Sequence, residues 1–224
     1  MSKAYQCVIF DWDGTLMNSE ARIVASVQYA AQQAGFPVLS AHESKQIIGL
    51  SLENAILTLY PQATTQDVAL MSNAYTEFFL EHCDVEMAPF SGAEALLADL
   101  KAQNVKLAIA TGKSRKGLNQ VLAETGFDAY FDFTRTPVES ESKPSPLMLQ
   151  QILEEFGLSV EQAVMVGDTE FDMQMARNIK MDAVALSHGV HELDVLKKHE
   201  PVECFDDLHS MREWLKQNIQ AYSA

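Results

Sequence analysis

The apolar residues of the chain fall into short runs, each of which stops at polar or glycine residues. The first run, Cys7–Phe10, ends at Asp11. Three later runs end in the same way, over residues 105–110, 163–166 and 183–186. Short runs rich in branched apolar side chains are typical of strands buried on both faces of a parallel sheet. The pattern therefore predicts buried strands that each lead into a polar loop.

Amphipathic helical patterns separate these runs. In one of them Leu96, Leu97 and Leu100 share a helix face. The predicted helices cover residues 93–103, 115–125, 146–156 and 171–179. Alternating strands and helices predict an α/β fold with a Rossmann-like, mostly parallel sheet and helices on both faces. Ligands of such sheets bind at the carboxyl ends of the strands, so we expect the chemistry in the polar loops there.

One stretch, from about residue 16 to residue 88, interrupts this alternation. Helical patterns cover residues 21–34, 51–59 and 65–81, with no obvious strand among them. We interpret the stretch as a helical insert; the alternative is that its helices pack on the sheet as ordinary connections. The sequence after it, from Ala88 to Gly92, is typical of a return hinge, with Ser91 as the expected N-cap of the next helix.

Two pairs of carboxylates follow predicted strands. Asp11 and Asp13 flank one residue at the end of the first strand, and Gly14 then lets the backbone turn. Asp168 and Asp172 follow a later strand, at a spacing that places both on one face of a starting helix. Like charges at such distances repel unless a cation lies between them. The pattern favours a hard, oxygen-preferring divalent cation such as Mg²⁺.

Groups suited to binding a phosphoryl group lie in two other loops. Thr111 and Gly112 follow a third predicted strand, and Lys143 lies in a loop stiffened by Pro144. A hydroxyl, a backbone amide and an ammonium group opposite carboxylates and a metal suit a transferring phosphoryl group. Each piece alone is weak evidence, but their order along the chain, each beside a predicted strand, favours a common site.

Taken together, these segments resemble the four motifs of the haloacid dehalogenase superfamily, and within it the phosphoglycolate-phosphatase-like group. The resemblance covers nearly the whole chain. In chain order, the matching segments are 11–15, 111–112, 143–144 and 167–172. Members of this group carry a helical cap between the first and second motifs. The resemblance thus implies a core domain of residues 1–15 and 88–224 and a cap domain of residues 16–87.

The resemblance also implies a role for each motif residue. Asp11 would attack phosphorus and form an aspartyl phosphate, and Asp13 would act as general acid and base. Thr111 and Lys143 would stabilise the transferring group. Mg²⁺ would be held by Asp11, the backbone carbonyl of Asp13 and Asp168, with Asp172 close behind.

Several residues around these motifs are expected to contact the substrate. They are Gly14 and Thr15 in the first motif, Gly112 and Lys113 in the second, and Gly49 in the insert. Gly49 belongs to a segment that dips toward the active site in similar proteins, and glycine permits a close backbone approach. The basic residue Lys113 stands where a small polar residue is common. Its side chain either contacts a substrate anion or is exposed to solvent.

Composition narrows the possible partners. Against 16 Lys and Arg the chain has 31 Asp and Glu, a formal net charge of −15 at pH 7. Such a field repels nucleic acid, and no apolar run reaches the ~20 residues that span a bilayer. Three widely spaced cysteines indicate neither a disulfide framework nor a zinc site. We therefore expect a cytoplasmic monomer or small homo-oligomer that binds neither nucleic acid nor membranes.

The function that this sequence favours is a Mg²⁺-dependent phosphatase acting on a small phosphorylated metabolite. A phosphomutase of the β-phosphoglucomutase type is the alternative, because it uses the same pair of aspartates and a similar cap. A 2-haloacid dehalogenase is disfavoured, since that branch lacks the acidic residue found here at Asp13. A non-catalytic protein that keeps the fold is also disfavoured, since every motif position is filled.

Overall fold

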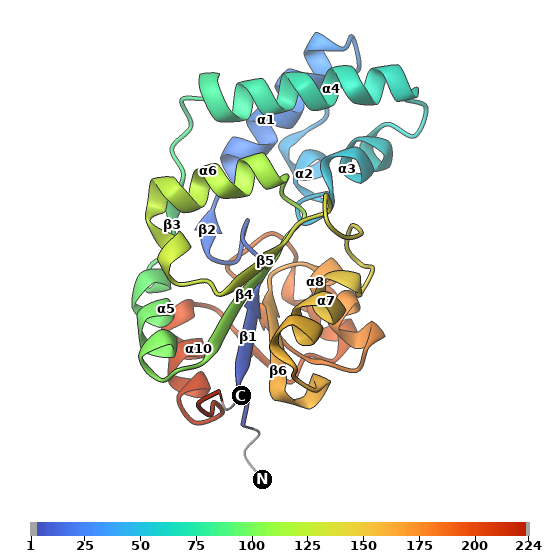
Figure 1. Cartoon of the computed structure of the whole chain (residues 1–224). Helices are drawn as coiled ribbons and strands as arrows, with labels where there is room; N and C mark the ends of the chain where they lie inside the picture. Colours follow the sequence, from blue (N-terminus) through green and yellow to red (C-terminus); the bar gives the residue numbers. More distant parts are fainter. Residues whose placement is uncertain (1–3, 223–224) are drawn as a thin grey trace.

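The computed structural model describes residues 4–222, and its centre is a six-stranded parallel sheet (Figure 1). The strand order is β5-β4-β1-β6-β7-β8. The strands are β1 (Cys7–Phe10), β4 (Lys106–Ala110), β5 (Phe133–Arg135), β6 (Ala163–Gly167), β7 (Asp182–Leu186) and β8 (Glu203–Phe205). The predicted α/β fold with a parallel sheet is thus confirmed.

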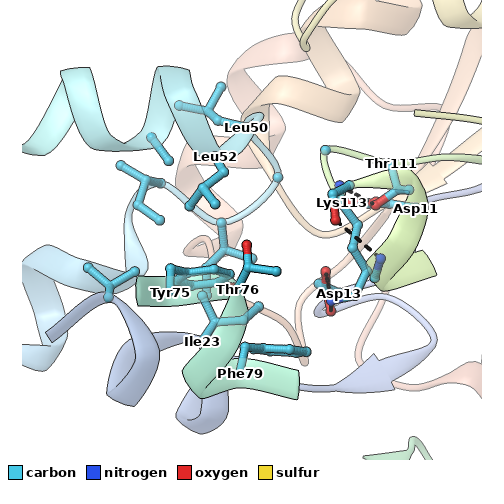
Figure 2. A pocket seen from close by; sticks show the side chains of 18 of the residues that line it. Asp11, Asp13, Ile23, Leu50, Leu52, Tyr75, Thr76, Phe79, Thr111 and Lys113 are labelled. Atoms are coloured by element: carbon cyan, nitrogen blue, oxygen red, sulfur yellow. Dashed lines mark hydrogen bonds and ion pairs between the residues drawn. The ribbon is translucent and has the colours of Figure 1, made fainter. Parts of the chain in front are cut away.

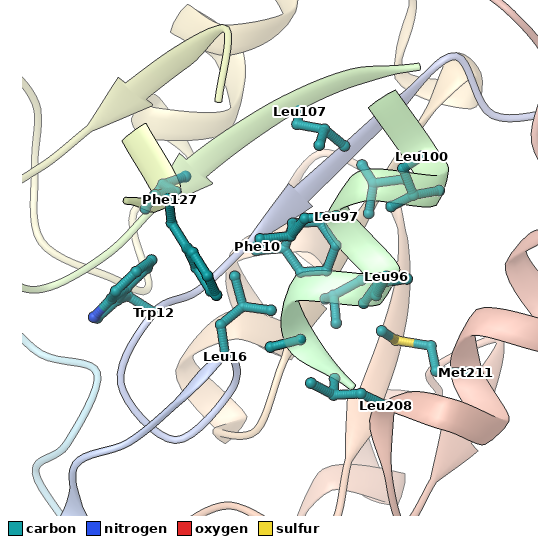
Figure 3. Packing of buried hydrophobic residues seen from close by; sticks show 14 of the residues in the cluster. Phe10, Trp12, Leu16, Leu96, Leu97, Leu100, Leu107, Phe127, Leu208 and Met211 are labelled. Atoms are coloured by element: carbon teal, nitrogen blue, oxygen red, sulfur yellow. The ribbon is translucent and has the colours of Figure 1, made fainter. Parts of the chain in front are cut away.

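Helices cover both faces of the sheet, as predicted. One face packs against α5 (Ala93–Ala102), α6 (Arg115–Thr125) and α10 (Leu208–Leu215), and the other against α7 (Leu147–Phe156), α8 (Glu170–Asn178) and α9 (Leu193–Leu196). Alternate residues of β1 pack on the two faces. Phe10 packs with Leu96 and Leu97 of α5 (Figure 3). Ile9 packs with Met148 of α7 on the other face. This alternation follows from the two-residue period of a strand. It makes β1 the buried centre of both layers.

A group of helices interrupts the sheet after β1 and lies beyond one end of it (Figure 1). It contains α1 (Glu20–Gln33), α2 (Ala41–Lys45), α3 (Leu52–Leu59) and α4 (Thr65–Glu77), which continues as a π-helical turn, η1 (Phe78–His82). These helices bury two apolar clusters. One, around Ile56 and Met71, draws only on this stretch, and the other, around Ile23 and Phe79, also includes Val190 from the loop after β7. They pack on each other and do not cover a face of the sheet.

A small antiparallel pair of strands joins this helical group to the rest of the chain. Strand β2 (Met17–Asn18) pairs with β3 (Ala88–Pro89), in the register Met17 to Pro89 and Asn18 to Ala88. The chain therefore leaves toward the helices and returns from them at neighbouring positions. Strands β2 and β3 have only two residues each, which is too short for an apolar pattern to reveal them.

Other differences from the sequence expectations are local. The helix α5 begins after Gly92, which has a φ of 88°, and its N-cap is not Ser91; the Ser91 hydroxyl lies 3.1 Å from His209 Nε2 instead. A positive φ favours glycine, so the turn itself selects this N-cap. Short 3-10 turns, η2 (Phe127–Ala129), η3 (Val160–Gln162) and η4 (Lys197–His199), complete the connections.

Within residues 4–222, none of the helices combines the length and the apolar character that crossing a lipid bilayer requires.

Candidate active site

The topology of the sheet brings three predicted site segments to one edge. Strand β1 is flanked by β4 on one side and β6 on the other, so the strand order switches direction at this point. A crevice forms at the carboxyl ends of strands at such a switch point. Asp11 follows β1, Thr111 follows β4, and Asp168 follows β6. The polar residues predicted at separate strand ends therefore meet there.

Three buried carboxylates form a tight group at this edge. Each of Asp11, Asp168 and Asp172 offers an oxygen, and these oxygens all lie within 4.8 Å of one another. Burial, only partly offset by Lys143, raises the pKa of Asp11 to about 7. Burial and the neighbouring Asp172 and Asp11 raise the pKa of Asp168 well above its ordinary value. The cluster is thus costly to ionise fully without a further cation.

The surroundings of this group fit a small, hard cation. All three side chains are oxygen donors, which Mg²⁺ prefers. Glycines leave room for them: a Cβ on Gly14 or Gly189 would lie 2.2 Å from Asp168 Oδ2, and one on Gly167 would lie 2.3 Å from Cγ of Asp172. A side chain at any of these three positions would therefore collide with the carboxylates.

Hydrogen bonds fix the orientation of two of these carboxylates. The Thr15 hydroxyl donates to Asp168 Oδ1 at 2.7 Å, and the Val190 amide donates to Oδ2 at 2.8 Å. Asp172 lies in the first turn of α8, where its Oδ2 accepts from the amide and hydroxyl of Thr169. Asp168 precedes that helix, so the prediction that both aspartates lie on one helix face is wrong. Their carboxylate oxygens nevertheless lie close together.

Lys143 supplies a positive charge at the centre of the group. Its buried Nζ lies 2.9 Å from Asp11 Oδ2 and 2.6 Å from Asp172 Oδ1. Burial disfavours the charged ammonium, but the two carboxylates outweigh it and raise the pKa of Lys143. The ammonium is therefore held charged against the side chain of Asp11.

Asp13 has a different partner. Its two carboxylate oxygens lie 3.1 and 3.0 Å from Nζ of Lys113, and this ammonium also lies 4.3 Å from the centre of the Phe79 ring (Figure 2). The Asp13 carboxylate is not part of the group of three. Lys113 thus links the loop after β1 to η1 of the helical group.

The loop after β4 is in close contact with the segment before α3. A Cβ on Gly112 would lie 2.3 Å from the carbonyl oxygen of Gly49 and 2.4 Å from that of Leu50, so only glycine fits. Gly49 itself has a φ of 102°, and a Cβ there would lie 3.1 Å from Thr169 Oγ1. Nearby, the Ser51 amide donates to the Ser142 hydroxyl. Gly49 therefore lies against the core, as expected from the sequence.

A cavity of about 70 Å³ lies between the sheet edge and the helical group (Figure 2). On the sheet side it is lined by Asp11, Asp13, Thr111 and Lys113. On the opposite side most of the lining is apolar, with Ile23, Leu52 and Phe79 among it. Thr111 is buried, and its Oγ1 accepts from the Lys113 amide at 3.3 Å. The arrangement presents the carboxylates of Asp11 and Asp13 and the ammonium group of Lys113 to whatever enters the cavity.

Sequence reasoning did not single out Thr169, Gly189 or Val190, which hold or make room for the acidic group. Gly189 lies in the polar loop that follows the predicted strand over residues 183–186, and the motif residues lie in loops of the same kind. This position was the signal by which Gly189 could have been found. His188, in the same loop, contacts the Thr15 carbonyl oxygen through Nε2 at 3.2 Å and lies against the Phe90 ring.

Comparison with known proteins agrees with this geometry. Residues 8–186 match the family model described as haloacid dehalogenase-like hydrolase. The chain is 26% identical over 219 residues to a phosphoglycolate phosphatase of Vibrio cholerae, covering 94% of this chain and 97% of that protein. It is 33% identical over 201 residues to the probable phosphatase IndB of Dickeya dadantii, covering 87% of this chain and 86% of that protein.

The solved structure of a predicted phosphatase from Clostridium acetobutylicum has the same fold, with a TM-score of 0.85 and 22% identity over 96% of this chain and 99% of that chain. The family match spans all four motif segments and the helical group between the first two. The chain therefore belongs to the haloacid dehalogenase-like hydrolases.

Proposed function

We propose that this protein is a Mg²⁺-dependent phosphatase that hydrolyses a small phosphorylated metabolite through an aspartyl phosphate. The observation that carries the proposal is the position of Asp11. It follows the central strand, lines the cavity, touches the ammonium of Lys143 and lies within 4.8 Å of two further carboxylates. A carboxylate in such a setting is a competent nucleophile toward phosphorus.

In the first step, an oxygen of Asp11 attacks the phosphorus atom, and the bond from phosphorus to the ester oxygen breaks. Asp13 also lines the cavity, and it donates a proton to the departing alkoxide. In the second step Asp13 takes a proton from water, whose oxygen attacks phosphorus. Inorganic phosphate leaves, and the Asp11 carboxylate is restored.

Positive groups on the chain balance the charge of the phosphoryl group. Lys143, held charged by Asp11 and Asp172, lies beside the attacking carboxylate. The Thr111 hydroxyl and the Gly112 amide are available to donate to phosphoryl oxygens from the end of β4. Their fixed positions lower the cost of reorganisation during transfer.

Asp11, Asp168 and Asp172 are the residues that would hold Mg²⁺, with the Asp13 backbone carbonyl as a further oxygen. When bound there, the ion supplies charge neutralisation for the phosphoryl oxygens. We further propose that residues 16–87 form a cap domain, since the apolar cluster around Ile56 and Met71 draws only on this stretch and the Gly49 segment contacts the loop after β4.

The test is phosphate release from a panel of phosphate monoesters, with Mg²⁺ present or chelated by EDTA. We expect Mg²⁺-dependent release that falls by about 10³-fold or more in Asp11→Asn, because the substituted amide is a poor nucleophile. Circular dichroism of the variant verifies that it folds. Release in Asp11→Asn near the wild-type rate would refute the nucleophile assignment.

The same assay separates hydrolysis from the mutase alternative. A hydrolase releases inorganic phosphate in proportion to the ester consumed. A mutase instead returns the phosphoryl group to another hydroxyl of the sugar, with little net release. Recovery of an isomeric sugar phosphate would therefore favour the mutase.

A further inference from the structure

We propose that the alcohol portion of the substrate is compact, uncharged and mainly apolar, so that the enzyme favours small alkyl phosphates over esters with a second anionic group. This inference rests on the proposed function and adds the substrate class. It follows from what lines the cavity and from where the positive charges of the helical group lie.

The cavity wall that faces the catalytic carboxylates is made of apolar side chains. Ile23 and Val27 come from α1, Ile47 and Ile48 precede α3, and Phe79 comes from η1; all five are buried and line the cavity. Such a wall binds apolar groups through the release of water, at about 25 cal/mol for each Å² removed from water. It offers no compensation for a desolvated charge.

The polar side chains on this wall carry no positive charge. They are Tyr75 and Thr76, and the Thr76 hydroxyl already donates to the Ser72 carbonyl oxygen at 2.8 Å. The Tyr75 ring is stacked on that of Phe79 at 5.7 Å. A hydroxyl of the alcohol portion would find partners here, whereas a carboxylate or second phosphate would lack a cation.

Residues 16–87, all of which the structure describes, contain two Lys or Arg residues, and both are engaged outside the cavity. The guanidinium of Arg22 donates to the Phe79 carbonyl oxygen at 2.9 and 2.6 Å. Lys45 lies 3.6 Å from a carboxylate oxygen of Glu20. The histidines of this stretch, His42 and His82, are exposed and do not line the cavity.

On the sheet side, each of the two ammonium groups near the cavity is already paired. Lys113 lies against both carboxylate oxygens of Asp13, and Lys143 lies between Asp11 and Asp172. Lys143 is positioned for the transferring phosphoryl group. Recruiting Lys113 for a second anion would break its contact with Asp13, so the loss of the existing pair would offset the gain from the new one.

The experiment compares isobutyl phosphate with 2-phosphoglycolate, because their alcohol portions have the same number of non-hydrogen atoms and differ in an isopropyl group against a carboxylate. We expect kcat/KM for isobutyl phosphate to exceed that for 2-phosphoglycolate by about 10-fold or more, mainly through a lower KM. The reason is that the carboxylate of 2-phosphoglycolate would lie unpaired in an apolar site. Equal values, or a preference for 2-phosphoglycolate, would overturn the inference.

A matched pair of variants locates the preference. Thr76→Lys adds a cation to the cavity wall and is expected to shift the ratio of the two kcat/KM values by about 10-fold toward 2-phosphoglycolate. Leu70→Lys adds the same charge at an exposed position of the same helix, outside the cavity, and should leave the ratio unchanged. An equal shift in both variants would assign the preference to overall charge and refute the role of the wall.

A binding measurement keeps the inference independent of turnover. The stable analogues are 3-methylbutylphosphonate and 3-phosphonopropionate, titrated calorimetrically into the wild-type protein with Mg²⁺. Tighter binding of 3-methylbutylphosphonate supports the apolar site even if no ester is hydrolysed, in which case the proposed function fails and the site assignment stands. Tighter binding of 3-phosphonopropionate, or no binding of the apolar analogue, overturns it.

Discussion

Asp11 and Asp13 are two positions apart, yet each meets a different ammonium group. Asp11 lies against Lys143 in the buried acidic group, whereas Asp13 lies against Lys113 beside the Phe79 ring. Two carboxylates with separate partners can take separate roles, one as nucleophile and one in proton transfer. Holding Asp13 by Lys113 also keeps its carboxylate out of the acidic group, where a fourth negative charge would add repulsion.

We predict that Asp13→Asn lowers kcat by roughly 10²-fold or more, because an amide cannot deliver or accept the proton. The loss in kcat/KM should be smaller for an ester whose leaving group needs no protonation, such as p-nitrophenyl phosphate. The kcat/KM values for that ester and for an alkyl phosphate test this, because kcat/KM reports the steps up to release of the alcohol and not the hydrolysis of the shared aspartyl phosphate. An equal loss on both esters would contradict a role in protonating the leaving group.

The raised pKa values of Asp11 and Asp168 predict how stability changes with pH. The pKa of Asp11 is about 7 in the folded protein against 3.8 ordinarily, so between these values the folded state binds more protons than the unfolded chain. Stability of the metal-free protein should therefore fall as the pH rises from about 4 to about 7. Melting temperatures measured in EDTA across this range test the slope.

Mg²⁺ should reverse this loss, since it binds the ionised carboxylates. We expect Mg²⁺ to raise the melting temperature more at pH 8 than at pH 5. A melting temperature in EDTA that rises steadily from pH 4 to pH 7 would contradict the raised pKa values of these carboxyls. A Mg²⁺ shift that is larger at pH 5 would contradict the assignment of this group as the metal site.

Much of the site was predictable from residues at the ends of apolar runs. Asp11, Thr111 and Asp168 each follow a strand, and the parallel order of the sheet then brings them together. The contacts between side chains far apart in the sequence were not predictable. The Thr15 hydroxyl reaches Asp168 across 153 positions, and Lys113 reaches Asp13 across 100, through packing that no local pattern encodes.

At the scale of the elements, the loop between β4 and α6 and the segment before α3 are in direct backbone contact, so the position of one limits the position of the other. Gly112 leaves space that the carbonyl groups of Gly49 and Leu50 fill. The contact holds an insert segment against the sheet edge through backbone atoms. Small displacements at either position therefore change the shape of the cavity.

We predict that Gly112→Ala lowers kcat/KM by about 10-fold or more, because the new methyl group forces this segment away from the cavity. Gly35→Ala is the matched control: Gly35 has a φ of 73° and open space around it. It should cost about 1 kcal/mol of stability through backbone strain and leave kcat/KM unchanged. Kinetics and urea unfolding of both variants separate the two effects.

Similar losses of kcat/KM in the two variants would refute the importance of the contact.

The elements that the sequence predicted best are those with long or uninterrupted apolar patterns. The helix α6 has the predicted bounds, Arg115–Thr125, and β1 is as expected. The strands β5 and β8 escaped prediction because each has only three residues and is an outermost strand of the sheet. Both contain polar residues, and neither is fully buried. Pairing with an existing neighbour, rather than local preference, stabilises such strands.

For the molecule as a whole, the net charge of −15 opposes the approach of an anionic substrate. We predict that kcat/KM for a phosphate monoester rises by about 2-fold or more when NaCl is increased from 10 to 150 mM at saturating Mg²⁺, since salt screens this repulsion. Leu70→Lys, which makes the charge less negative at an exposed site, should slightly weaken the dependence. A kcat/KM that falls with salt would indicate local attraction stronger than the overall field.

The paired strands β2 and β3 have a consequence for how such a protein can diversify. The chain departs at Met17–Asn18 and comes back at Ala88–Pro89, and these four residues form one antiparallel pair. The distance between departure and return is therefore the same whatever lies between them. Segments of other lengths and shapes can be exchanged at this junction over evolutionary time without altering the spacing of β1, β4 and β6. The inserted stretch can thus change while the acidic group at the carboxyl ends of the strands is inherited unchanged.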